Sequence, residues 1–323
     1  MKKGFSVIIV NYFSEKYIVP LAEELIKLPM ENVEILIVSN SPAAFGWSDG
    51  YLRNNNIKII QSDNNEGFGR AVNKGVALSQ YDCFFMVNPD VKLDHSVLQK
   101  LYERLGTEDA DTMAVSCTVK NEDGSLQRNY FTNHQLQLWP FFKQQMRVFL
   151  PSRFKAKRRR RIANAVLDQR FEVGGFYCSF VLMKKSLFDD IGGFDPDFFM
   201  YGEDIDLFRT RMPVTEKCVV YSDLDITHFG SKTDKYNLMD FQSQVSHLLY
   251  LRKVGLFYLL IYTVIRALRY FPLLLLPVSG GTYGRQKKVA SGFFASLKYL
   301  GNILRAKRYG SLEKCLKIDA IPD

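Results

Sequence analysis

Apolar runs of four to seven residues recur along the first 120 residues, and each ends at a polar or turn-forming residue. Such short continuous runs are typical of strands buried on both faces. Strands are predicted at residues 6–10, 33–38, 57–60, 83–87 and 113–119. Apolar residues at helical spacing between them predict helices at about residues 15–28, 67–78 and 96–105. This alternation predicts an α/β fold with a Rossmann-like, mostly parallel sheet flanked by helices, in which ligands bind at the carboxyl ends of the strands.

The second half of the chain has a less regular pattern. Strands are predicted at residues 176–183 and 217–227, with a short helix at 185–191 between them. Residues 153–161 form a dense basic run, RFKAKRRRR, which we interpret as a solvated loop in preference to a patch for phosphates or anionic lipid. The composition changes from about Tyr236 onward. Residues 1–235 are therefore predicted to form one α/β domain, and residues 236–323 a helical C-terminal region.

The C-terminal region is both apolar and basic. Residues 241–323 contain 13 Lys and Arg against 3 Asp and Glu, a net charge of +10 in a chain whose total is +9. The uninterrupted apolar core, residues 254–265, is too short to span a bilayer. Apolar helices flanked by basic residues favour a segment that lies in a membrane interface beside anionic lipid. The alternative is a soluble helical hairpin packed on the α/β core.

The cysteine pattern indicates a reducing compartment. The five cysteines are scattered and form no CxxC pair, so neither a disulfide framework nor a zinc site is indicated. The apolar run after Lys2 and Lys3 is too short for a signal sequence and fits a first strand. We expect a cytoplasmic protein.

The stretch from Phe194 to Leu207, FDPDFFMYGEDIDL, places five carboxylates among four aromatic residues. This mixture favours an apolar-walled cleft in which neighbours tune the pKa of one or two carboxylates. The alternative is that the acids of residues 203–206 only complement the dipole of a helix that begins there.

Three other stretches carry candidate chemistry. Residues 64–75, NNEGFGRAVNKG, have glycines that would let backbone approach a ligand at a helix start, or that merely relieve that start. Asp90, in MVNPDV, directly follows a buried strand and could hold Mg²⁺ or Mn²⁺, or simply form a turn. His228, at another strand end in HFGSKT, could add a nitrogen ligand or be an ordinary surface histidine.

Taken in order, several motifs resemble the family 2 glycosyltransferases with the GT-A fold, and most nearly their rhamnosyltransferase-like branch. The motifs are SVIIVNY, NNEGFGRAVNKG, MVNPDV, GGFYCSFVLMKKSLFDDIGGFDPDFFMYGEDIDLFRTRM and HFGSKT. The resemblance covers roughly residues 4 to 235, and the segment around GEDIDL is its most specific part.

The resemblance implies a role for each matching residue. Asn88 and Asp90 stand at the metal motif, with Asp90 on the cation, and His228 would help to bind the metal or the diphosphate. Glu203 and Asp204 match the acidic pair, with Asp204 as general base. The implied donor-binding residues are Asn11, Ser39, Asn40, Asp63, Gly67, Arg70, Asn88 and Asp90. Beside these, we expect an acceptor wall of Phe198, Phe199 and Tyr201, because aromatic faces suit sugar rings.

Two positions depart from the family pattern. The second strand usually ends in Val-Asp-Asn, where the aspartate contacts the base, but this chain has Ser39 there. Phe13 replaces an asparagine in the first turn. The loss of the carboxylate leaves recognition of the nucleotide open.

The activity implied is inverting, metal-dependent hexosyl transfer from a nucleotide-diphosphate sugar. dTDP-rhamnose is the first expectation for the donor, with UDP-linked sugars open. The acceptor would be a polyprenyl-diphosphate-linked glycan of O-antigen or capsule synthesis, at the inner face of the bacterial plasma membrane, and a homo-oligomer is conceivable. A degenerate sugar-nucleotide or glycan-binding protein is the alternative. A nucleic-acid binder is disfavoured, because the basic residues lie in an apolar tail and not on a recognition fold.

Overall fold

The computed structural model describes residues 3–42, 45–131, 141–143, 169–230, 238–275 and 281–318. The basic run at 153–161 lies outside these residues. The chain divides into two compact units. The first unit contains the sheet and is assigned residues 1–134, 167–194 and 207–232. The second contains residues 195–206 together with the chain from residue 233 onward, and it also includes Phe141.

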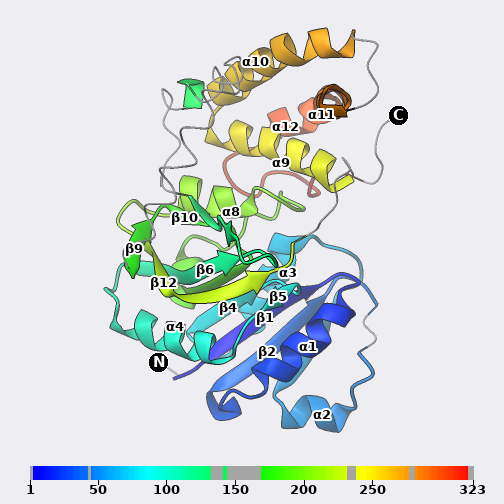
Figure 1. Ribbon diagram of the computed structural model, residues 1–323. Helices are drawn as coiled ribbons and strands as arrows, with labels where there is room; N and C mark the ends of the chain where they lie inside the picture. The colour runs from blue at the N-terminus through cyan, green and yellow to red at the C-terminus, as the bar shows by residue number, and fades with distance from the viewer. Residues whose placement is uncertain are drawn as a thin grey trace. The chain divides into compact units, whose positions relative to one another are not determined.

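The first unit is built on a central sheet whose strand order is β3-β2-β1-β4-β11-β6-β12-β5 (Figure 1). The strands are β1 (Phe5–Asn11), β2 (Val33–Ser39), β3 (Ile57–Gln61), β4 (Cys83–Val87), β5 (Val91–Lys92), β6 (Thr112–Lys120), β11 (Phe180–Lys184) and β12 (Lys217–His228). Four neighbouring pairs are parallel, namely β3 with β2, β2 with β1, β1 with β4, and β6 with β12. The predicted α/β fold with a mostly parallel sheet is confirmed.

Helices and short strands complete the first unit. The helices are α1 (Glu15–Leu25), α2 (Asp49–Asn54), α3 (Phe68–Leu78), α4 (Ser96–Thr107) and α7 (Lys185–Asp190), with a 3-10 turn at Met30–Asn32 and a π-helical turn at Leu207–Arg211. The short strands are β7 (Leu126–Gln127), β8 (Tyr130–Phe131), β9 (Arg170–Val173) and β10 (Gly175–Phe176). The predicted helices lie within a few residues of α1, α3 and α4.

One predicted strand is wrong in its extent. Residues 176–183 were expected to form a single strand, but Phe176 belongs to β10, which pairs with β8 in a separate two-stranded sheet, and β11 begins at Phe180. A tight turn separates the two, since Ser179 N donates to Tyr177 O at 2.8 Å. β11 then enters the main sheet antiparallel between β4 and β6.

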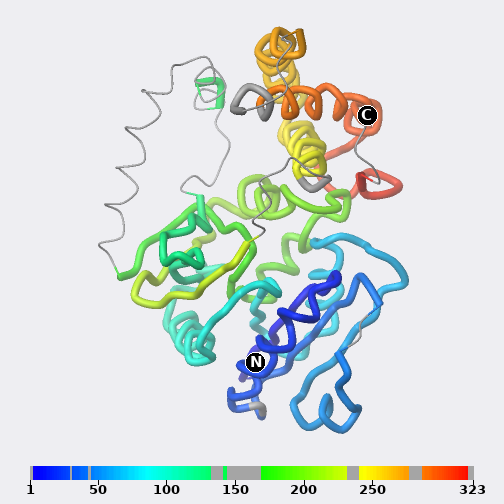
Figure 2. The backbone as a smooth tube through the Cα atoms, turned by 45° about the vertical axis from the view of Figure 1, so that its right-hand side comes forward, coloured from blue at the N-terminus to red at the C-terminus, as the bar shows by residue number. Residues whose placement is uncertain are grey.

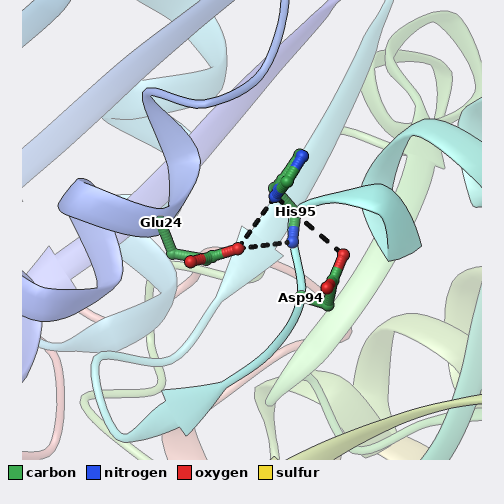
Figure 3. Close-up of side chains that lie close together, drawn as sticks. All are labelled: Glu24, Asp94 and His95. Atoms are coloured by element: carbon green, nitrogen blue, oxygen red, sulfur yellow. Dashed lines mark hydrogen bonds and ion pairs between the residues drawn. The ribbon is translucent and has the colours of Figure 1, made fainter.

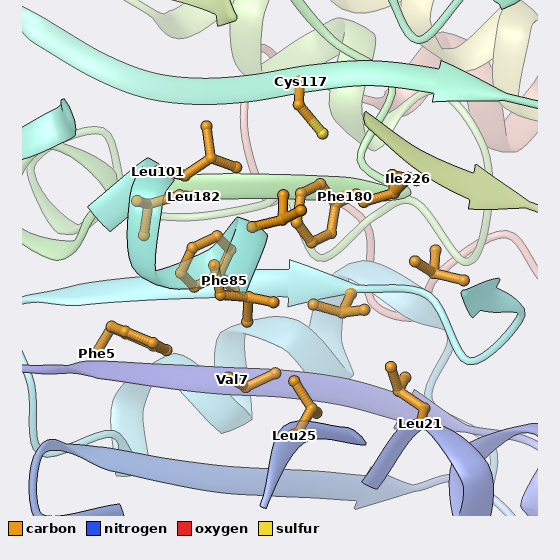
Figure 4. Packing of buried hydrophobic residues seen from close by; sticks show 14 of the residues in the cluster. Phe5, Val7, Leu21, Leu25, Phe85, Leu101, Cys117, Phe180, Leu182 and Ile226 are labelled. Carbon is orange, nitrogen blue, oxygen red and sulfur yellow. The ribbon is translucent and has the colours of Figure 1, made fainter. Parts of the chain in front are cut away.

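Apolar side chains fill both faces of the sheet. Phe5, Phe85, Leu101 and Phe180 belong to one buried cluster, in which α1 and α4 pack on the strands (Figure 4). The cluster on the other face contains residues of α3, together with Phe188 and Phe194. The strands β2, β1, β4 and β11 are therefore buried on both faces, as their largely apolar sequences predict.

The second unit is helical. It consists of α8 (Glu203–Asp206), α9 (Leu238–Val254), α10 (Leu256–Leu274), α11 (Gly281–Ser296), a 3-10 turn (Leu297–Tyr299) and α12 (Leu300–Arg305). The helices α9, α10 and α11 lie side by side within it (Figure 2). Its core includes Phe198 from the acidic stretch as well as residues of these helices.

Candidate active site

Strand pairing brings Asp90 and His228 together at one edge of the sheet. β4 ends at Val87, and the chain turns through Asn88 and Pro89 before entering β5. β5 pairs with the end of β12, with Val91 opposite His228. This register places Asp90 Oδ1 3.1 Å from His228 Nε2, although the two residues are 138 positions apart in sequence. Both predicted metal-binding residues therefore share one place in the first unit.

The environment of this pair suits a divalent cation. His228 Nδ1 lies 2.9 Å from Gln127 Oε1, and an amide oxygen can only accept, so Nδ1 carries the proton. Nε2, beside Asp90 Oδ1, can donate to that oxygen when it carries a proton, and can bind a cation through its lone pair when it does not. One imidazole nitrogen beside one carboxylate oxygen is a common part of a transition-metal site, and a second residue that fixes the tautomer is typical of one. Burial raises the pKa of Asp90, but hydrogen bonding and the charge of His228 outweigh it, so the pKa is lowered and the ligand is an anion.

Asn11 and Ser39 are buried in a hydrogen-bond network where β1 and β2 end. Asn11 Nδ2 donates to Ser39 Oγ at 2.9 Å and to Glu15 at 2.8 Å, and Asn11 Oδ1 accepts from Ser14 N. Ser39 Oγ donates to Ser41 O at 2.6 Å. Both side chains have no exposed surface, and their hydrogen bonds hold the loops that follow β1 and β2 in place. Their predicted contact with the nucleotide stays a prediction.

The glycine-containing loop before α3 is held by asparagines. Asn40 Nδ2 donates to Gly67 O at 2.9 Å, and Asn65 Oδ1 accepts from Gly67 N. Gly67 has φ of 89°, a left-handed conformation that favours glycine. Gly75 has a different role, since a Cβ there would lie 2.8 Å from Ile8 Cγ2, so it allows α3 to pack on the sheet. Asp63 is exposed and Arg70 half-buried on either side of this loop.

In the second unit, the acidic pair has two unlike members. Glu203 is buried, and this burial together with the charge of Asp204 raises the pKa of Glu203 to about 8. Asp204 is half-buried, and its Oδ1 accepts from Ile205 N at 2.7 Å. At neutral pH Glu203 is therefore mostly protonated, which leaves Asp204 as the accessible member able to act as a base.

The raised pKa of Glu203 makes stability depend on pH. A carboxyl whose folded-state pKa exceeds its unfolded value stabilises the fold fully below the unfolded pKa, and this contribution is lost as pH rises through the folded value. The window here runs from 4.5 to about 8. We expect the unfolding free energy of wild type to fall relative to Glu203→Gln by at most about 1.4 kcal/mol per pH unit across it. Denaturant unfolding of both at pH 5, 6.5 and 8 measures this, and a constant difference would contradict it.

The predicted acceptor wall is only partly accessible. Phe198 is fully buried in the helical core of the second unit, and Phe199 is 5% exposed with Lys317 Nζ 5.4 Å from its ring centroid. Tyr201 is 40% exposed and has φ of 67°. Burial gives the two phenylalanines a packing role, and Tyr201 alone of the three presents a ring to an acceptor.

The comparisons with known proteins decide the family. A model of the family described as "Glycosyl transferase family 2" matches residues 6–192, more than half of the chain. The chain belongs to this family. Glycosyltransferase GlyG of Streptococcus pneumoniae is 23% identical over 116 residues, which cover 35% of this chain and 38% of GlyG. The alignment thus spans little more than a third of that relative.

Solved structures show the same fold for this family 2 glycosyltransferase. TarS residues 1–349 of S. aureus, in complex with UDP, has a TM-score of 0.51 at 15% identity, over 91% of this chain and 71% of that one. The mannosyltransferase PcManGT of Pyrobaculum calidifontis, in complex with GDP-Man and Mn²⁺, has a TM-score of 0.52 at 12% identity, over 93% and 87%. The expected GT-A fold is confirmed.

The first two acids of the stretch at 194–207 serve structure in this glycosyltransferase. Lys253 Nζ donates to Asp197 Oδ2 at 2.6 Å and forms an ion pair, without hydrogen-bond geometry, with Asp195 Oδ2 at 2.8 Å. Asp197 also accepts from Ser311 N and Leu312 N. All three charged side chains are buried. Sequence reasoning missed the role of Lys253, because a lysine in the last turn of a helix also complements the helix dipole.

A second group of histidine and carboxylates, Glu24, Asp94 and His95, lies in the first unit of the enzyme (Figure 3). Glu24 Oε1 accepts from both His95 N and His95 Nδ1, at 3.1 and 2.8 Å. Hydrogen bonds from Lys27 and then His95 lower the pKa of Glu24 to about 2. These contacts already satisfy the carboxylate, so the group ties the start of α4 to α1.

Proposed function

We propose that this glycosyltransferase transfers a sugar, with inversion, from a nucleotide-diphosphate donor to a hydroxyl of a lipid-linked glycan, in a metal-dependent reaction. The observation that carries the proposal is the Asp90–His228 pair, with its 3.1 Å separation and Gln127 behind the imidazole. The carboxylate oxygen of Asp90 and the imidazole nitrogen of His228 are ligands that fit Mn²⁺ or Mg²⁺. Such a cation, when bound, neutralises charge on the leaving diphosphate.

The protein's own part is to hold the donor and to move a proton. Asp204 takes the proton from the acceptor hydroxyl as that oxygen attacks the anomeric carbon from the face opposite the diphosphate. The C–O bond to the diphosphate breaks as the new glycosidic bond forms, so no covalent enzyme intermediate is needed. Glu203, largely protonated at neutral pH, leaves Asp204 as the charged member of the pair.

Structural neighbours support the class of donor. TarS was solved in complex with UDP, and PcManGT in complex with GDP-Man and Mn²⁺. They support a nucleotide-sugar donor and a divalent cation for this chain. dTDP-rhamnose is the first candidate, on the resemblance to the rhamnosyltransferase-like branch, in synthesis of O-antigen or capsule. UDP-linked hexoses are the second.

The proposal predicts a metal-dependent donor. A thermal-shift screen of nucleotide sugars, with and without Mn²⁺ or Mg²⁺, should give one donor whose stabilisation increases with metal. Asp90→Ala should lower the affinity for that donor in the presence of metal by about 10- to 100-fold, because a metal ligand is lost. Asp94→Ala, at an exposed acid on the same connection, is the matched control and should bind as wild type. Metal-independent binding, unaffected by Asp90→Ala, would contradict the metal role.

A non-catalytic sugar-nucleotide or glycan-binding protein is the second candidate, because Ser39 stands where a carboxylate is usual. It predicts donor binding without donor hydrolysis or transfer. Slow metal-dependent release of nucleoside diphosphate by wild type, lost in Asp204→Asn, would decide for the enzyme.

We further propose that the C-terminal helices rest on the cytoplasmic face of the plasma membrane, beside a polyprenyl-diphosphate-linked acceptor. Among the described residues, α10 is the helix whose length and apolar composition would allow it to cross a bilayer. Its most apolar 18 residues have a mean hydropathy of 1.4, and 17% of them are buried. It is longer than the apolar core predicted from the sequence, because the helix continues through Arg266 and Arg269. Its exposed large apolar residues include Phe257, Leu260, Val264, Leu268 and Phe271. Their spacing places them on one face, and the net charge of this region favours an anionic surface.

This face predicts a specific loss of lipid binding. The double variant Leu260→Glu with Leu268→Glu should reduce sedimentation with vesicles that contain anionic phospholipid by about tenfold, because it places two charges in the apolar face. Leu78→Glu, at a leucine that is 55% exposed on α3, is the control. Equal loss in both variants, or none in either, would remove the membrane role from α10.

A further inference from the structure

Three polar residues stand in one row where β1, β2 and β3 end. Strand register pairs Asn11 with Ser39, and Ser39 with Gln61. These strands are parallel neighbours, so the three residues mark the carboxyl edge of the sheet, where ligands of such folds bind. Asn11 and Ser39 are fully buried, whereas Gln61 is exposed. Gln61 is thus the member of the row that a ligand can reach.

The amide of Gln61 is fixed in one orientation. Its Nε2 lies 3.2, 3.1 and 3.0 Å from the carbonyl oxygens of Ser39, Ser41 and Ser62. Carbonyl oxygens only accept, so the nitrogen and not the oxygen of the amide faces them. Within the described part of the chain, no hydrogen bond engages Oε1. Gln61 therefore offers one neutral acceptor whose direction the backbone sets.

An exposed aromatic ring is joined to the same network. Phe13 N donates to Ser41 Oγ at 2.9 Å, so Ser41 links Phe13 to Gln61. Phe13 has φ of 51°, which is rare for a bulky residue, and its side chain is 65% exposed. Backbone held in such a conformation is frequent at ligand sites. The ring gives a face on which any base can stack, while Oε1 can distinguish one base from another.

We propose that Gln61 selects the base of the donor nucleotide, its Oε1 accepting the ring N3–H of uracil or thymine. This inference rests on the proposed function. With the diphosphate at Asp90, beyond β4, a nucleoside that follows the sheet edge passes β1 and β2 toward β3. Phe13 supplies stacking, and Gln61 supplies the choice of base.

The chemistry of the acceptor determines which bases fit. Uracil and thymine present a single ring N–H between two carbonyl groups, which matches one acceptor oxygen. Cytosine and adenine have a bare ring nitrogen at the corresponding position, so two acceptors would face each other. Guanine presents two adjacent donors, which match the two oxygens of a carboxylate better than the single oxygen of Gln61.

A cycle that alters both protein and ligand tests this contact. Calorimetry would compare UDP, dTDP, CDP, ADP, GDP and N3-methyl-UDP, with Mn²⁺, on the full chain. For wild type we expect UDP or dTDP to bind best, and N3-methyl-UDP to bind roughly tenfold more weakly than UDP. Gln61→Leu should bind UDP roughly tenfold more weakly and no longer distinguish it from N3-methyl-UDP. Gln99→Leu, at an amide that donates to Glu103 on α4, is the matched control and should behave as wild type.

Each other outcome overturns a definite claim. Equal affinity of wild type for UDP and N3-methyl-UDP would overturn the role of Gln61 while leaving a nucleotide-dependent enzyme in place, and this comparison needs no variant that folds. Tightest binding of GDP, or full discrimination by Gln61→Leu, would do the same. Binding of no nucleoside diphosphate would instead overturn the proposed function.

Discussion

Asp204→Asn is expected to lower the rate of sugar transfer by about 10²- to 10⁴-fold, the contribution of a general base. The amide keeps the size of the side chain but cannot take the acceptor proton. Glu203 is a poor replacement at neutral pH, because its burial, the larger cause of its raised pKa, persists in this variant after the charge of Asp204 is lost. Single-turnover assays of product formation at saturating donor would measure the loss, and calorimetry would measure donor affinity, which should change by less than about twofold.

The control for this substitution is Asp189→Asn, an exposed acid on α7. It should leave transfer and donor binding unchanged. A loss of donor affinity in Asp204→Asn as large as its loss of rate would place Asp204 in donor binding and not in proton transfer. A rate that increases again as the pH is raised in Asp204→Asn would indicate that Glu203, once ionised, can serve as the base.

The regular first part of the fold could be predicted because its signals are local. Each of β1 to β4 is mainly apolar, with Glu34 in β2 and Lys58 in β3 as interruptions, and the helices α1 and α3 have their own apolar spacing. The place of β11 could not be predicted in this way. Its pairing with β4 and β6 depends on contacts between residues far apart in sequence, and the split at Tyr177 depends on a turn with no glycine or proline to mark it.

The candidate site shows the same limit. The sequence singles out Asp90 and His228, each at the end of a predicted strand. No sequence pattern points to Gln127, which lies in the two-residue strand β7. The five acids at 195–206 look alike in sequence. The structure divides four of them between a buried ion cluster and the Glu203–Asp204 pair, because Lys253 reaches Asp197 from 56 residues away, and the fifth, Asp206, is also buried. Family resemblance could select Asp204, but local composition could not.

This packing changes how the C-terminal region should be tested. Residues 195–206 and the helices after residue 238 belong to one compact unit, and Ser246 Oγ donates to Met200 O within it. Removal of residues 241–323 would therefore expose the core around Phe198 as well as remove α10. Loss of activity in such a truncation would say nothing about lipid. Point substitutions on the exposed face of α10 separate the two effects.

The buried ion cluster predicts the largest effect on stability. Lys253→Met should destabilise the protein by about 3–5 kcal/mol, because it leaves Asp195 and Asp197 as buried charges without their cation. Denaturant unfolding, followed by a probe in the helical unit, would measure the change. Lys314→Met, at an exposed lysine of the same unit, should change stability by less than about 0.5 kcal/mol.

A combined variant separates the charge from the shape of Lys253. Lys253→Met together with Asp195→Asn and Asp197→Asn removes all three charges. The amide oxygen at position 195 can still accept from Gly310 N, and the single amide oxygen at position 197 can accept from Ser311 N or from Leu312 N, but not from both. This variant should recover part of the stability lost in Lys253→Met, since replacing a whole buried ion group costs less than removing one partner, while one backbone donor at position 311 or 312 loses its acceptor. Equal destabilisation of the single and combined variants would instead show that packing of the lysine stem, and not its charge, holds the loop at 195–201 on α9.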